Sequence, residues 1–421
     1  MKTTDAETKF QLLFVNSNDK MGQRFSGIDW FEKLEEQGFS SRMLIGRDKS
    51  SDDERVQTFR NRTPILFQNA VKYFERSLGR QSYLSPTYLE LSTQEGFQNA
   101  DLVHYQVIHD GSWFRLEDLP RLSLRKPSIW TWHDAWPITG HCIQPLSCPQ
   151  FRKECEICPH LDWPMPLTRD TAKSERLRKT SIIKKSKVNV HVTSKWMANL
   201  ISDSGNYENL ELKIIPFGLD ISLFNPKGRE KMRHKYGIAE DSFVIGIRAS
   251  DWVVKNTQLF IDTIERLNTA DRRVEIFIYE KTDTLWRKSN LPTGIRAHDF
   301  GWLDDATLIE TYRCLNVFLG ISTGESFGFM PLEAAACGAI PISLKGTAVS
   351  EFVAKIDPIL SIENDVFALK EILERLLTDN SMYMYLQKKT LDVIASSYTL
   401  DEYIGKLVSF YREVIEGEPN A

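Results

Sequence analysis

The chain has 421 residues, of which 42% are hydrophobic and 26% charged, and its net charge is −4. This length exceeds what one hydrophobic core organises, so two domains are expected, and the composition is that of a globular protein in water. The small negative charge gives no case for a nucleic acid partner. The polar N-terminus lacks a signal-peptide core, and no uncharged apolar run approaches the ~20 residues of a membrane helix. We therefore expect a cytoplasmic protein, with peripheral attachment to the inner face of the membrane left open.

The first half of the sequence alternates strand and helix patterns, as doubly wound α/β domains do. A buried strand at 10–16 leads through a turn at Gly22 into one helix, which ends at Gly38. Further strands are predicted at 42–45, 102–105, 128–132 and 188–193. We expect an N-terminal, acceptor-side domain over 1–216, with a cysteine-rich insertion at about 141–160.

The second half repeats this rhythm without sharing its sequence. Apolar patterns predict strands at 243–247, 274–279, 317–322 and 339–344, and helices at 259–267, 305–315 and 366–377. Between the last two strands, a short helix is predicted to begin at Pro331 and end at Gly338. We expect a second domain over 217–396 and a C-terminal helix over 397–421 that packs back toward the first domain.

The stretch 324–334 follows a predicted strand and carries two carboxylates. Glu325 and Glu333 lie eight positions apart around a helix start, where free N–H groups and the backbone of Gly328 can hold a phosphate. A carboxylate accepts two hydrogen bonds from a diol, so Glu333 suits a ribose and Glu325 the hydroxyls of a sugar. Phosphate and hydroxyl groups together suggest a nucleotide sugar.

Two cations follow another strand of the second domain. Arg248 ends the strand at 243–247, and Lys255 lies in the loop after it. Loops at the carboxyl ends of strands converge on one crevice in a doubly wound sheet. We expect both side chains to hold a diphosphate and to neutralise it as it leaves.

A polar pair, His133 and Asp134, follows the predicted strand at 128–132. A polar pair at the carboxyl end of a strand is placed to face a ligand. The alternative is a capped turn whose histidine is hydrogen bonded within the fold. Both readings stay open at this point.

Four of the six cysteines are clustered at Cys142, Cys148, Cys155 and Cys158. The C-x-x-C spacing of the last two suits a structural zinc site, which four thiolates would complete. Flanking His141 and His160 can substitute as ligands. Unligated thiols and disulfides are the alternatives.

Two basic segments, 64–80 and 171–187, are candidates for contact with a membrane surface. The first has a helical apolar pattern among Lys and Arg residues, and the second carries seven Lys or Arg residues against one Glu. Such segments bind anionic lipid surfaces. More often an amphipathic helix packs on its own domain and a charge run is a solvated face.

Together these residues resemble the retaining glycosyltransferases of family 4, which have the GT-B fold. The main signature is carried by Glu325-x-Phe327-Gly328, Glu333-Ala334, Gly338 and Pro341. The segment 215–220 is similar to the linker of that family, and the resemblance covers nearly the whole chain. The stretch 131–142 with its four cysteines resembles a bacterial subgroup of exopolysaccharide, capsule and O-antigen assembly, including the colanic acid glycosyltransferases.

The resemblance implies two Rossmann-like domains facing a central cleft, and a hexosyltransferase that uses a UDP- or GDP-sugar and a glycan or lipid-linked acceptor. It implies that Glu325 and the backbone of Gly328, Phe329 and Met330 hold the donor sugar and phosphates, while Glu333 binds the ribose. It implies that His133 lies near the transferred sugar. It places Gly22 in a loop that approaches the donor phosphate, and it implies no metal for catalysis.

The chain departs from the family at several positions. Met21-Gly22-Gln23-Arg24 replaces Gly-Gly-Ala in the first loop, Phe217 replaces an Asn of the linker, and Asn256 replaces a frequent Gly. The gap between Arg248 and Lys255 is one residue longer than expected. The changed first loop motivates one alternative function, a non-catalytic nucleotide-sugar-binding subunit. The other alternative is an isomerase similar to UDP-sugar 2-epimerases.

Overall fold

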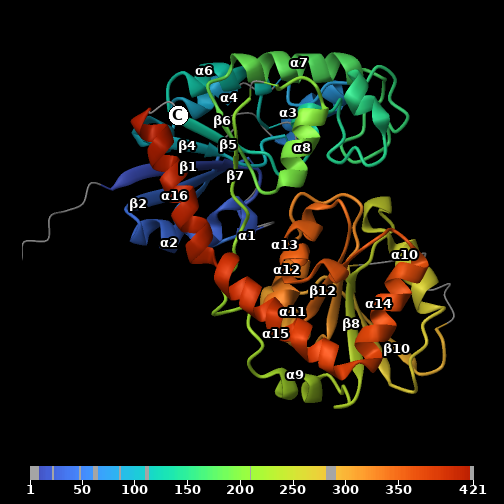
Figure 1. Cartoon of the computed structure of the whole chain (residues 1–421). Coiled ribbons are helices and arrows are strands. Elements are labelled where there is room, and N and C mark those ends of the chain that lie inside the picture. Colours follow the sequence, from blue (N-terminus) through green and yellow to red (C-terminus); the bar gives the residue numbers. More distant parts are fainter. Residues whose placement is uncertain are drawn as a thin grey trace, which may run out of the picture. The chain divides into compact units, whose positions relative to one another are not determined.

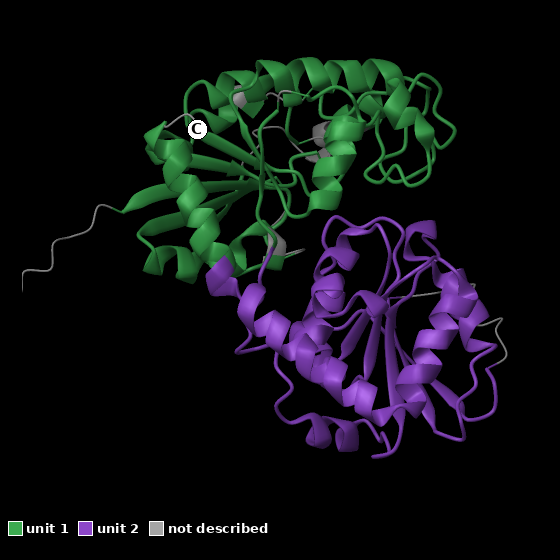
Figure 2. Ribbon diagram, in the orientation of Figure 1, with its two compact units in different colours: residues 1–216, 403–421 green, residues 217–402 purple. Residues whose placement is uncertain are grey.

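The structure is a computed structural model that describes residues 9–20, 23–46, 49–59, 65–84, 87–109, 113–208, 210–280 and 291–417. The chain divides into two compact units, residues 1–216 with 403–421 and residues 217–402 (Figure 2). Each unit is a parallel sheet with helices interleaved between its strands (Figure 1). The predicted class, two α/β halves of the Rossmann kind, is confirmed.

The first unit has a seven-stranded sheet in the order β3-β2-β1-β4-β5-β6-β7. Its strands are β1 (Phe10–Asn16), β2 (Phe39–Ile45), β3 (Val56–Thr58), β4 (Leu102–Tyr105), β5 (Ser128–Thr131), β6 (Asn189–Val192) and β7 (Leu212–Ile214). Its helices are α1 (Gln23–Ser26), α2 (Phe31–Glu36), α3 (Ile65–Ser77), α4 (Thr87–Leu91), α5 (Glu95–Asn99), α6 (Leu119–Ser123), α7 (Ala172–Lys185) and α8 (Lys195–Asp203). All residues of β4 and β5 are buried, because helices cover both faces of the sheet.

The second unit has a six-stranded sheet in the order β10-β9-β8-β11-β12-β13. Its strands are β8 (Phe243–Arg248), β9 (Val274–Tyr279), β10 (Ile295–Gly301), β11 (Val317–Gly320), β12 (Ile340–Leu344) and β13 (Ser361–Ile362). Its helices are α9 (Arg229–Lys235), α10 (Thr257–Ile264), α11 (Asp305–Cys314), α12 (Phe329–Ala336), α13 (Ala348–Ile356), α14 (Val366–Thr378) and α15 (Asn380–Ser397). The last helix of the chain, α16 (Leu400–Glu416), begins in this unit and continues into the first.

The single helix predicted between Gly22 and Gly38 is wrong. The structure has α1, a 3-10 turn at Ile28–Trp30 and then α2. The break lies at Gly27, whose φ of 110° is in the left-handed region. A Cβ atom there would lie 2.9 Å from the ring of Phe14, so the contact with β1 requires glycine. The amphipathic pattern of the segment does not reveal this break.

The predicted start of helix α12 at Pro331 is also wrong, by two residues. The helix begins at Phe329, after Gly328 in a left-handed conformation. Pro331 is tolerated at the third position because the first N–H groups of a helix have no partner within it. The sequence reasoning missed α15 and β10 altogether, since neither has a clean apolar period.

The chain passes between the units twice, and the two connecting segments pair with each other. Leu219 N–H donates to the carbonyl oxygen of Tyr398 (2.9 Å), and Leu400 N–H donates to the carbonyl oxygen of Leu219 (2.7 Å). A Cβ atom on Gly218 would lie 2.0 Å from the carbonyl oxygen of Thr399, so only glycine fits where these two segments lie against each other. Among the described residues, no helix has the length and apolar character needed to cross a membrane.

Candidate active site

The predicted turn after β11 leads through a left-handed glycine directly into helix α12. β11 lies between β8 and β12 near the middle of its sheet, and all four of its residues are buried. Gly328 has a φ of 101°, and a Cβ atom there would lie 2.6 Å from Val349. Only glycine therefore suits this position, and its conformation turns the chain directly into α12. The first N–H groups of the helix follow immediately.

A small pocket lies at the carboxyl ends of β8 and β11. Four predicted site residues line it, namely Arg248, Lys255, Glu325 and Met330, together with 318–322 and Pro331. Lys255 Nζ lies 3.9 Å from Glu325 Oε1. Desolvation lowers the pKa of the buried Lys255 amine, against the opposing effect of Glu325. The structure thus brings two cations and one carboxylate together at the edge where α/β sheets bind ligands.

Arg248 is oriented by neighbours that the sequence reasoning did not identify. Its Nε donates to Glu280 Oε2 (2.6 Å), and its guanidinium carbon lies 5.8 Å from the ring centroid of Trp302. Trp302 is 76% exposed, although a side chain this large and apolar is usually covered. The sequence feature that could have identified this neighbour is the tryptophan directly after Gly301, the last residue of β10.

Glu333 lies inside the fold rather than on the lining of the small pocket. It is on α12, is only 2% exposed, and its Oε2 accepts a hydrogen bond from the Tyr312 hydroxyl (3.1 Å). This contact fixes the direction of the carboxylate from the neighbouring helix α11. The sequence pattern gave no indication of Tyr312.

Two departures from the family pattern have a physical explanation. Asn256 has a φ of 56°, a left-handed conformation that Asn adopts more readily than most residues besides Gly. Phe217 packs against Phe327 and Phe329, with ring centroids 5.3 and 4.9 Å apart. These two rings flank Gly328, so Phe217 braces the turn. Gly22 and Met21 lie outside the described residues.

The pair His133–Asp134 follows β5, as predicted, but its two members have different partners. Asp134 accepts from the Trp136 N–H (2.8 Å) and lies 3.1 Å from His109 Nε2. Desolvation raises the pKa of Asp134, but His109 and the Trp136 amide outweigh it and hold that pKa below its usual value. Asp134 therefore caps the turn after β5. This is the alternative to ligand binding that the sequence left open for the pair.

His133 is partly exposed, and its Nε2 lies 2.6 Å from the side-chain amide of Gln106. Desolvation lowers the pKa of His133 to about 3, against the opposing effect of Asp134. The ring is therefore neutral at pH 7. Gln106, at the carboxyl end of β4, was not predicted as a site residue.

The cysteine cluster forms a partly buried loop in the first unit. His141 Nε2 lies 3.2 Å from Cys158 Sγ, and Cys155 packs with Phe151 in a small apolar cluster. Burial raises the pKa of Cys142 to about 12. No group of three or more His, Cys, Asp or Glu side chains in the described part of the chain is placed to hold a metal ion. Cysteine sulfur and histidine nitrogen atoms suit zinc, but in this structure they are not arranged around one point. The zinc site therefore stays a prediction.

Three basic residues of the segment 171–187 support the fold instead of facing solvent. Arg176 donates to the carbonyl oxygens of Phe151 and Ser204. Arg178 binds the carboxylates of Glu175 and Glu117, at 2.8 and 2.7 Å.

Lys179 is the third of these residues. It donates to the Trp136 carbonyl oxygen (2.6 Å), and its amine lies 4.1 Å from the Trp136 ring centroid. Desolvation lowers the pKa of Lys179 to about 7. Helix α7 therefore holds the loop after His133 and the cysteine insertion in place.

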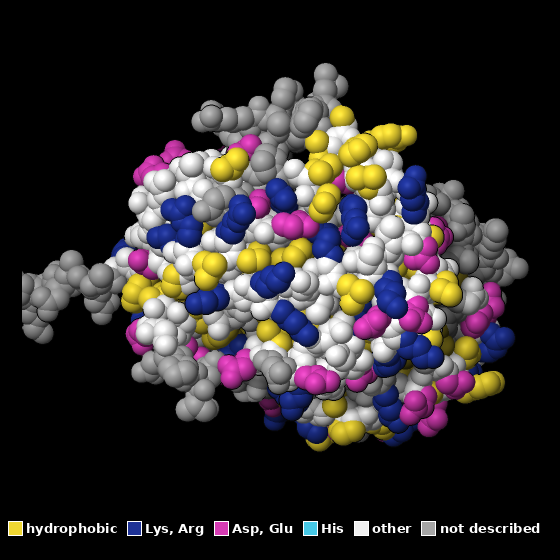
Figure 3. Space-filling view, turned by 90° about the horizontal axis from the view of Figure 1, so that it is seen from above, with side chains coloured by type: hydrophobic (Ala, Val, Ile, Leu, Met, Phe, Trp, Pro, Cys, Tyr) yellow, Lys and Arg dark blue, Asp and Glu magenta, His cyan; other side chains and the backbone are white. Residues whose placement is uncertain are grey.

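The segment 64–80 contains exposed apolar side chains. Tyr73 and Phe74 on α3 are 78% and 55% exposed, and Leu78 directly follows the helix. Figure 3 shows that hydrophobic side chains lie among Lys and Arg side chains on one face of the molecule. An exposed apolar group beside cations is the composition of a membrane-surface helix.

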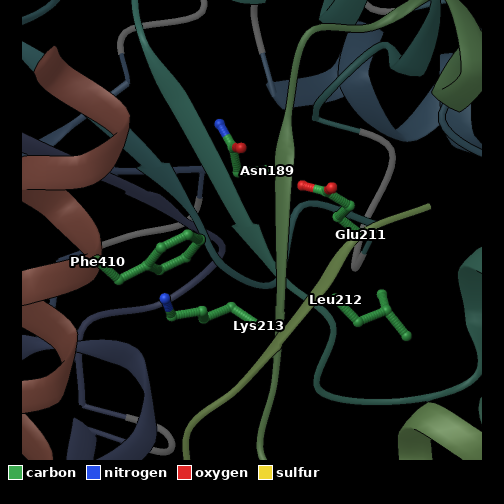
Figure 4. Close-up of a pocket in the computed structure, with 5 residues that line it drawn as sticks. All are labelled: Asn189, Glu211, Leu212, Lys213 and Phe410. Atoms are coloured by element: carbon green, nitrogen blue, oxygen red, sulfur yellow. The ribbon is translucent and has the colours of Figure 1, made fainter. Parts of the chain in front are cut away.

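A second pocket, of about 290 Å³, lies in the first unit (Figure 4). It is lined by Asn189, Glu211, Leu212, Lys213 and Phe410. Lys213 Nζ donates to both carboxylate oxygens of Glu413, at 2.7 and 2.9 Å. Asn189 and Leu212 begin their strands, so this pocket lies at the amino ends of the sheet. His133 follows the carboxyl end of its strand, so the second pocket is not part of the candidate site.

Comparison with known proteins finds similarity in sequence and in fold. Residues 228–392 match the family described as glycosyl transferases group 1. The chain is 24% identical over 215 residues to D-inositol 3-phosphate glycosyltransferase 1 of Catenulispora acidiphila, covering 48% of this chain and 51% of that protein. It is 33% identical over 91 residues to the serotype-specific mannosyltransferase WbdA of Escherichia coli, covering 22% of this chain and 11% of that protein.

The fold is similar to that of HepE from Anabaena, solved in complex with UDP. The TM-score is 0.68 at 15% identity, covering 96% of this chain and 100% of that chain. Two parallel α/β units with this likeness define a protein of the GT-B fold. Over residues 228–392 the chain is similar to the glycosyl transferases group 1.

Proposed function

We propose that this protein is a glycosyltransferase that moves a sugar from a nucleotide-sugar donor to a glycan or lipid-linked acceptor. The observation that carries the proposal is the pocket where Arg248, Lys255 and Glu325 converge. Two cations suit a diphosphate, and a carboxylate beside them suits sugar hydroxyls. The match of residues 228–392 to the group 1 family supports the same function.

Each donor group has a partner in the second unit. Arg248 and Lys255 hold the diphosphate, and Glu325 binds hydroxyls of the sugar. Backbone N–H groups at Gly328, Phe329 and Met330 add hydrogen bonds to the phosphates, since the first N–H groups of a helix have no partner within it. Glu333, oriented by Tyr312, binds the ribose. From the resemblance alone, we also propose that Gly22, which lies outside the described residues, contacts the donor phosphate.

The reaction we propose is a hexosyl transfer with retention of configuration. The bond between the anomeric carbon and the leaving phosphate oxygen breaks, and a bond to the acceptor hydroxyl oxygen forms on the same face of the sugar. The leaving phosphate takes the acceptor proton. Arg248 and Lys255 neutralise the charge that develops on the diphosphate, so the proposed step needs no metal. His133 contacts the transferred sugar from the first unit.

The donor and the pathway are proposed from the named relatives. HepE is solved with UDP, which favours a UDP-sugar, and a GDP-sugar is the alternative. WbdA is a serotype-specific mannosyltransferase, which favours a role in bacterial surface polysaccharide assembly, where the colanic acid enzymes also act. The protein would then work at the cytoplasmic face of the membrane, touching it through residues 64–80 and the exposed lysines of 171–187.

The test combines ligand binding with turnover. A panel of UDP- and GDP-sugars is screened for a rise in unfolding midpoint, because a ligand that binds only the folded state stabilises it by mass action. The donor that binds is then assayed with Glu325→Gln and Glu333→Ala. Glu363→Gln serves as the matched control, because Glu363 is exposed and paired with Lys345. We expect at least a 100-fold loss of turnover in each site variant and none in the control.

Other outcomes point to the alternative functions. Conversion of the donor without any acceptor indicates an isomerase. Donor binding with neither hydrolysis nor transfer indicates a non-catalytic subunit, and the loop 21–24 is then the first place to restore Gly-Gly-Ala. Unchanged turnover in both glutamate variants shows that the site is assigned wrongly.

A further inference from the structure

Glu280, the residue directly after β9, has a backbone conformation that glutamate rarely adopts. Its φ of 72° lies in the left-handed region, which glycine enters freely and which other residues enter at a cost in free energy. The neighbouring strand holds this conformation, because Glu280 N–H donates to the carbonyl oxygen of Gly301 at the end of β10 (3.0 Å). A strained residue beside a candidate site indicates that its side chain has a role there.

The side chain of Glu280 forms an ion pair with Arg248. Glu280 Oε2 accepts a hydrogen bond from Arg248 Nε at 2.6 Å, which is short, as hydrogen bonds between charged groups are. The pair connects two neighbouring strands. Arg248 is the last residue of β8 and lies opposite Tyr279, the last residue of β9, in the parallel register. Glu280 follows one position later, so its carboxylate can meet the guanidinium.

The ion pair uses only one nitrogen of the guanidinium. Nε carries a single N–H group, whereas the two Nη groups carry four. Among the described residues, neither Nη group makes a hydrogen bond, and the Arg248 side chain lines the small pocket with Lys255 and Glu325. Two Nη groups in one plane match two oxygen atoms of a phosphate group, which a lysine amine does not. Arg248 can therefore bind a phosphate through both Nη groups while Glu280 holds its Nε.

The charge of Glu280 also acts on the pocket. Arg248 and Lys255 are cations there. Glu280 and Glu325 are anions, so the formal charges of the four side chains balance. Desolvation lowers the pKa of the Lys255 amine, and the charges of Glu325 and Glu280 oppose this effect. Removing the charge of Glu280 would therefore change the attraction of the pocket for a phosphate, even if Arg248 kept its position.

We propose that Glu280 is a positioning residue that holds Arg248 at Nε, so that both Nη groups of Arg248 bind one phosphate group of the nucleotide sugar. Glycine fits the backbone at position 280 better than glutamate, but it cannot make this contact. The inference rests on the proposed function, because the phosphate belongs to the nucleotide sugar. The ion pair itself is present in the protein without a ligand.

The test compares two variants of the full chain that remove the same charge. Glu280→Gln keeps an oxygen that accepts the hydrogen bond from Arg248 Nε, whereas Glu280→Gly removes the side chain and fits the left-handed backbone without strain. The difference between the two variants therefore reports the position of Arg248, separately from the change in charge. Calorimetry measures the affinity for inorganic pyrophosphate, and kcat and KM are measured with the nucleotide sugar that the thermal screen identifies.

We expect Glu280→Gly to bind pyrophosphate about 5-fold more weakly than Glu280→Gln and to have a kcat about 10-fold lower. The unfolding midpoint of Glu280→Gly should equal or exceed that of the unmodified protein, because the relief of backbone strain offsets the loss of the ion pair. A purely structural role of Glu280 gives the opposite pattern. The midpoint then falls, and the folded protein binds pyrophosphate equally well in both variants.

The chain offers a matched control at Glu154 in the first unit. This glutamate also has a left-handed backbone, with a φ of 58°, and its carboxylate lies 3.7 Å from Lys173 Nζ. Glu154→Gly therefore makes the same change to the backbone and to a glutamate–lysine ion pair, away from the small pocket. We expect it to leave pyrophosphate affinity and kcat as they are in the unmodified protein.

The positioning role and the proposed function fail in different ways. Equal pyrophosphate affinity in Glu280→Gly and Glu280→Gln overturns the positioning role, as does an unmodified protein that does not bind pyrophosphate. If the affinities differ as expected but the unmodified protein turns over no nucleotide sugar, the positioning role stands and the proposed transfer is wrong. If the affinities differ while kcat is the same, Glu280 positions Arg248 for binding, and Arg248 does not neutralise the leaving diphosphate.

Discussion

Phe217, the first residue of the second unit, packs against Phe329, the first residue of helix α12, with ring centroids 4.9 Å apart. Phe217 lies one residue before Gly218, which crosses close against Thr399. The turn after β11 and the segment that enters the second unit are therefore in direct contact. A polar Asn at position 217 would leave the two phenylalanines beside Gly328 without this ring.

The first prediction concerns this contact. Phe217→Ala removes a buried aromatic ring, and we expect it to lower the free energy of unfolding by about 3 kcal/mol and to weaken donor binding. Phe217→Leu keeps most of the apolar volume and should lose less of both. Urea unfolding and a donor titration measure the two effects. Equal donor affinity in all three proteins would show that the ring does not support the turn.

The second prediction concerns Lys255, the buried cation of the small pocket at the ends of β8 and β11. Lys255→Met removes a desolvated amine and keeps a flexible apolar side chain, so we expect unchanged or higher stability together with at least a 100-fold loss of kcat. Thermal unfolding and turnover are measured on the same preparation. Lys345→Met, at an exposed position, is the control. A variant that keeps its activity would exclude Lys255 from diphosphate stabilisation.

The third prediction is a loss of stability in acid. Burial lowers the pKa of His191 to about 4, whereas a histidine in an unfolded chain has a pKa of about 6.5. Below pH 6.5 the unfolded chain binds a proton that the folded chain does not, so stability is present above pH 6.5 and is lost as the pH falls toward 4. At pH 4.5 this ring alone accounts for about 2 to 3 kcal/mol.

Urea unfolding at pH 7 and pH 4.5 measures this loss. His191→Gln removes the titrating ring, so the stability of this variant should fall less on acidification than that of the unmodified protein. The exposed His234→Gln should behave like the unmodified protein. Identical acid losses in all three would contradict the buried neutral state of His191.

The fourth prediction concerns the cysteine cluster. If Cys142, Cys148, Cys155 and Cys158 bind zinc, elemental analysis of the purified protein will find about one zinc per chain. Cys155→Ser should lose the metal, whereas Cys337→Ser, at a buried cysteine of the second unit, should retain it. A folded protein without metal would rule the zinc site out. The raised pKa of Cys142 then predicts slow alkylation at pH 8.

The fifth prediction concerns attachment to membranes. We expect the protein to co-sediment with anionic lipid vesicles, and Tyr73→Ser with Phe74→Ser to reduce the bound fraction several-fold. Phe367→Ser is the control, because Phe367 is an exposed aromatic residue on α14 of the second unit. Binding that is equal in all variants would exclude α3 from the contact.

The sequence determined the fold class and the convergence of three predicted site residues, because both depend on local patterns. Buried strands such as 243–248 and 317–320 are continuous apolar runs, and loops at their carboxyl ends meet at one edge of any parallel sheet. Arg248, Lys255 and Glu325 could therefore be placed together before the structure was known.

Only the tertiary structure decided which partner each side chain has. Gln106 and Tyr312 act on His133 and Glu333 from other strands and helices, so no spacing along the chain reveals them. Burial of the basic side chains of α7 likewise depends on what packs against the helix. The charge of a buried ring is decided in the same way, because burial lowers the pKa of His191 to about 4 and its Nε2 lies 3.0 Å from the Ile215 carbonyl oxygen.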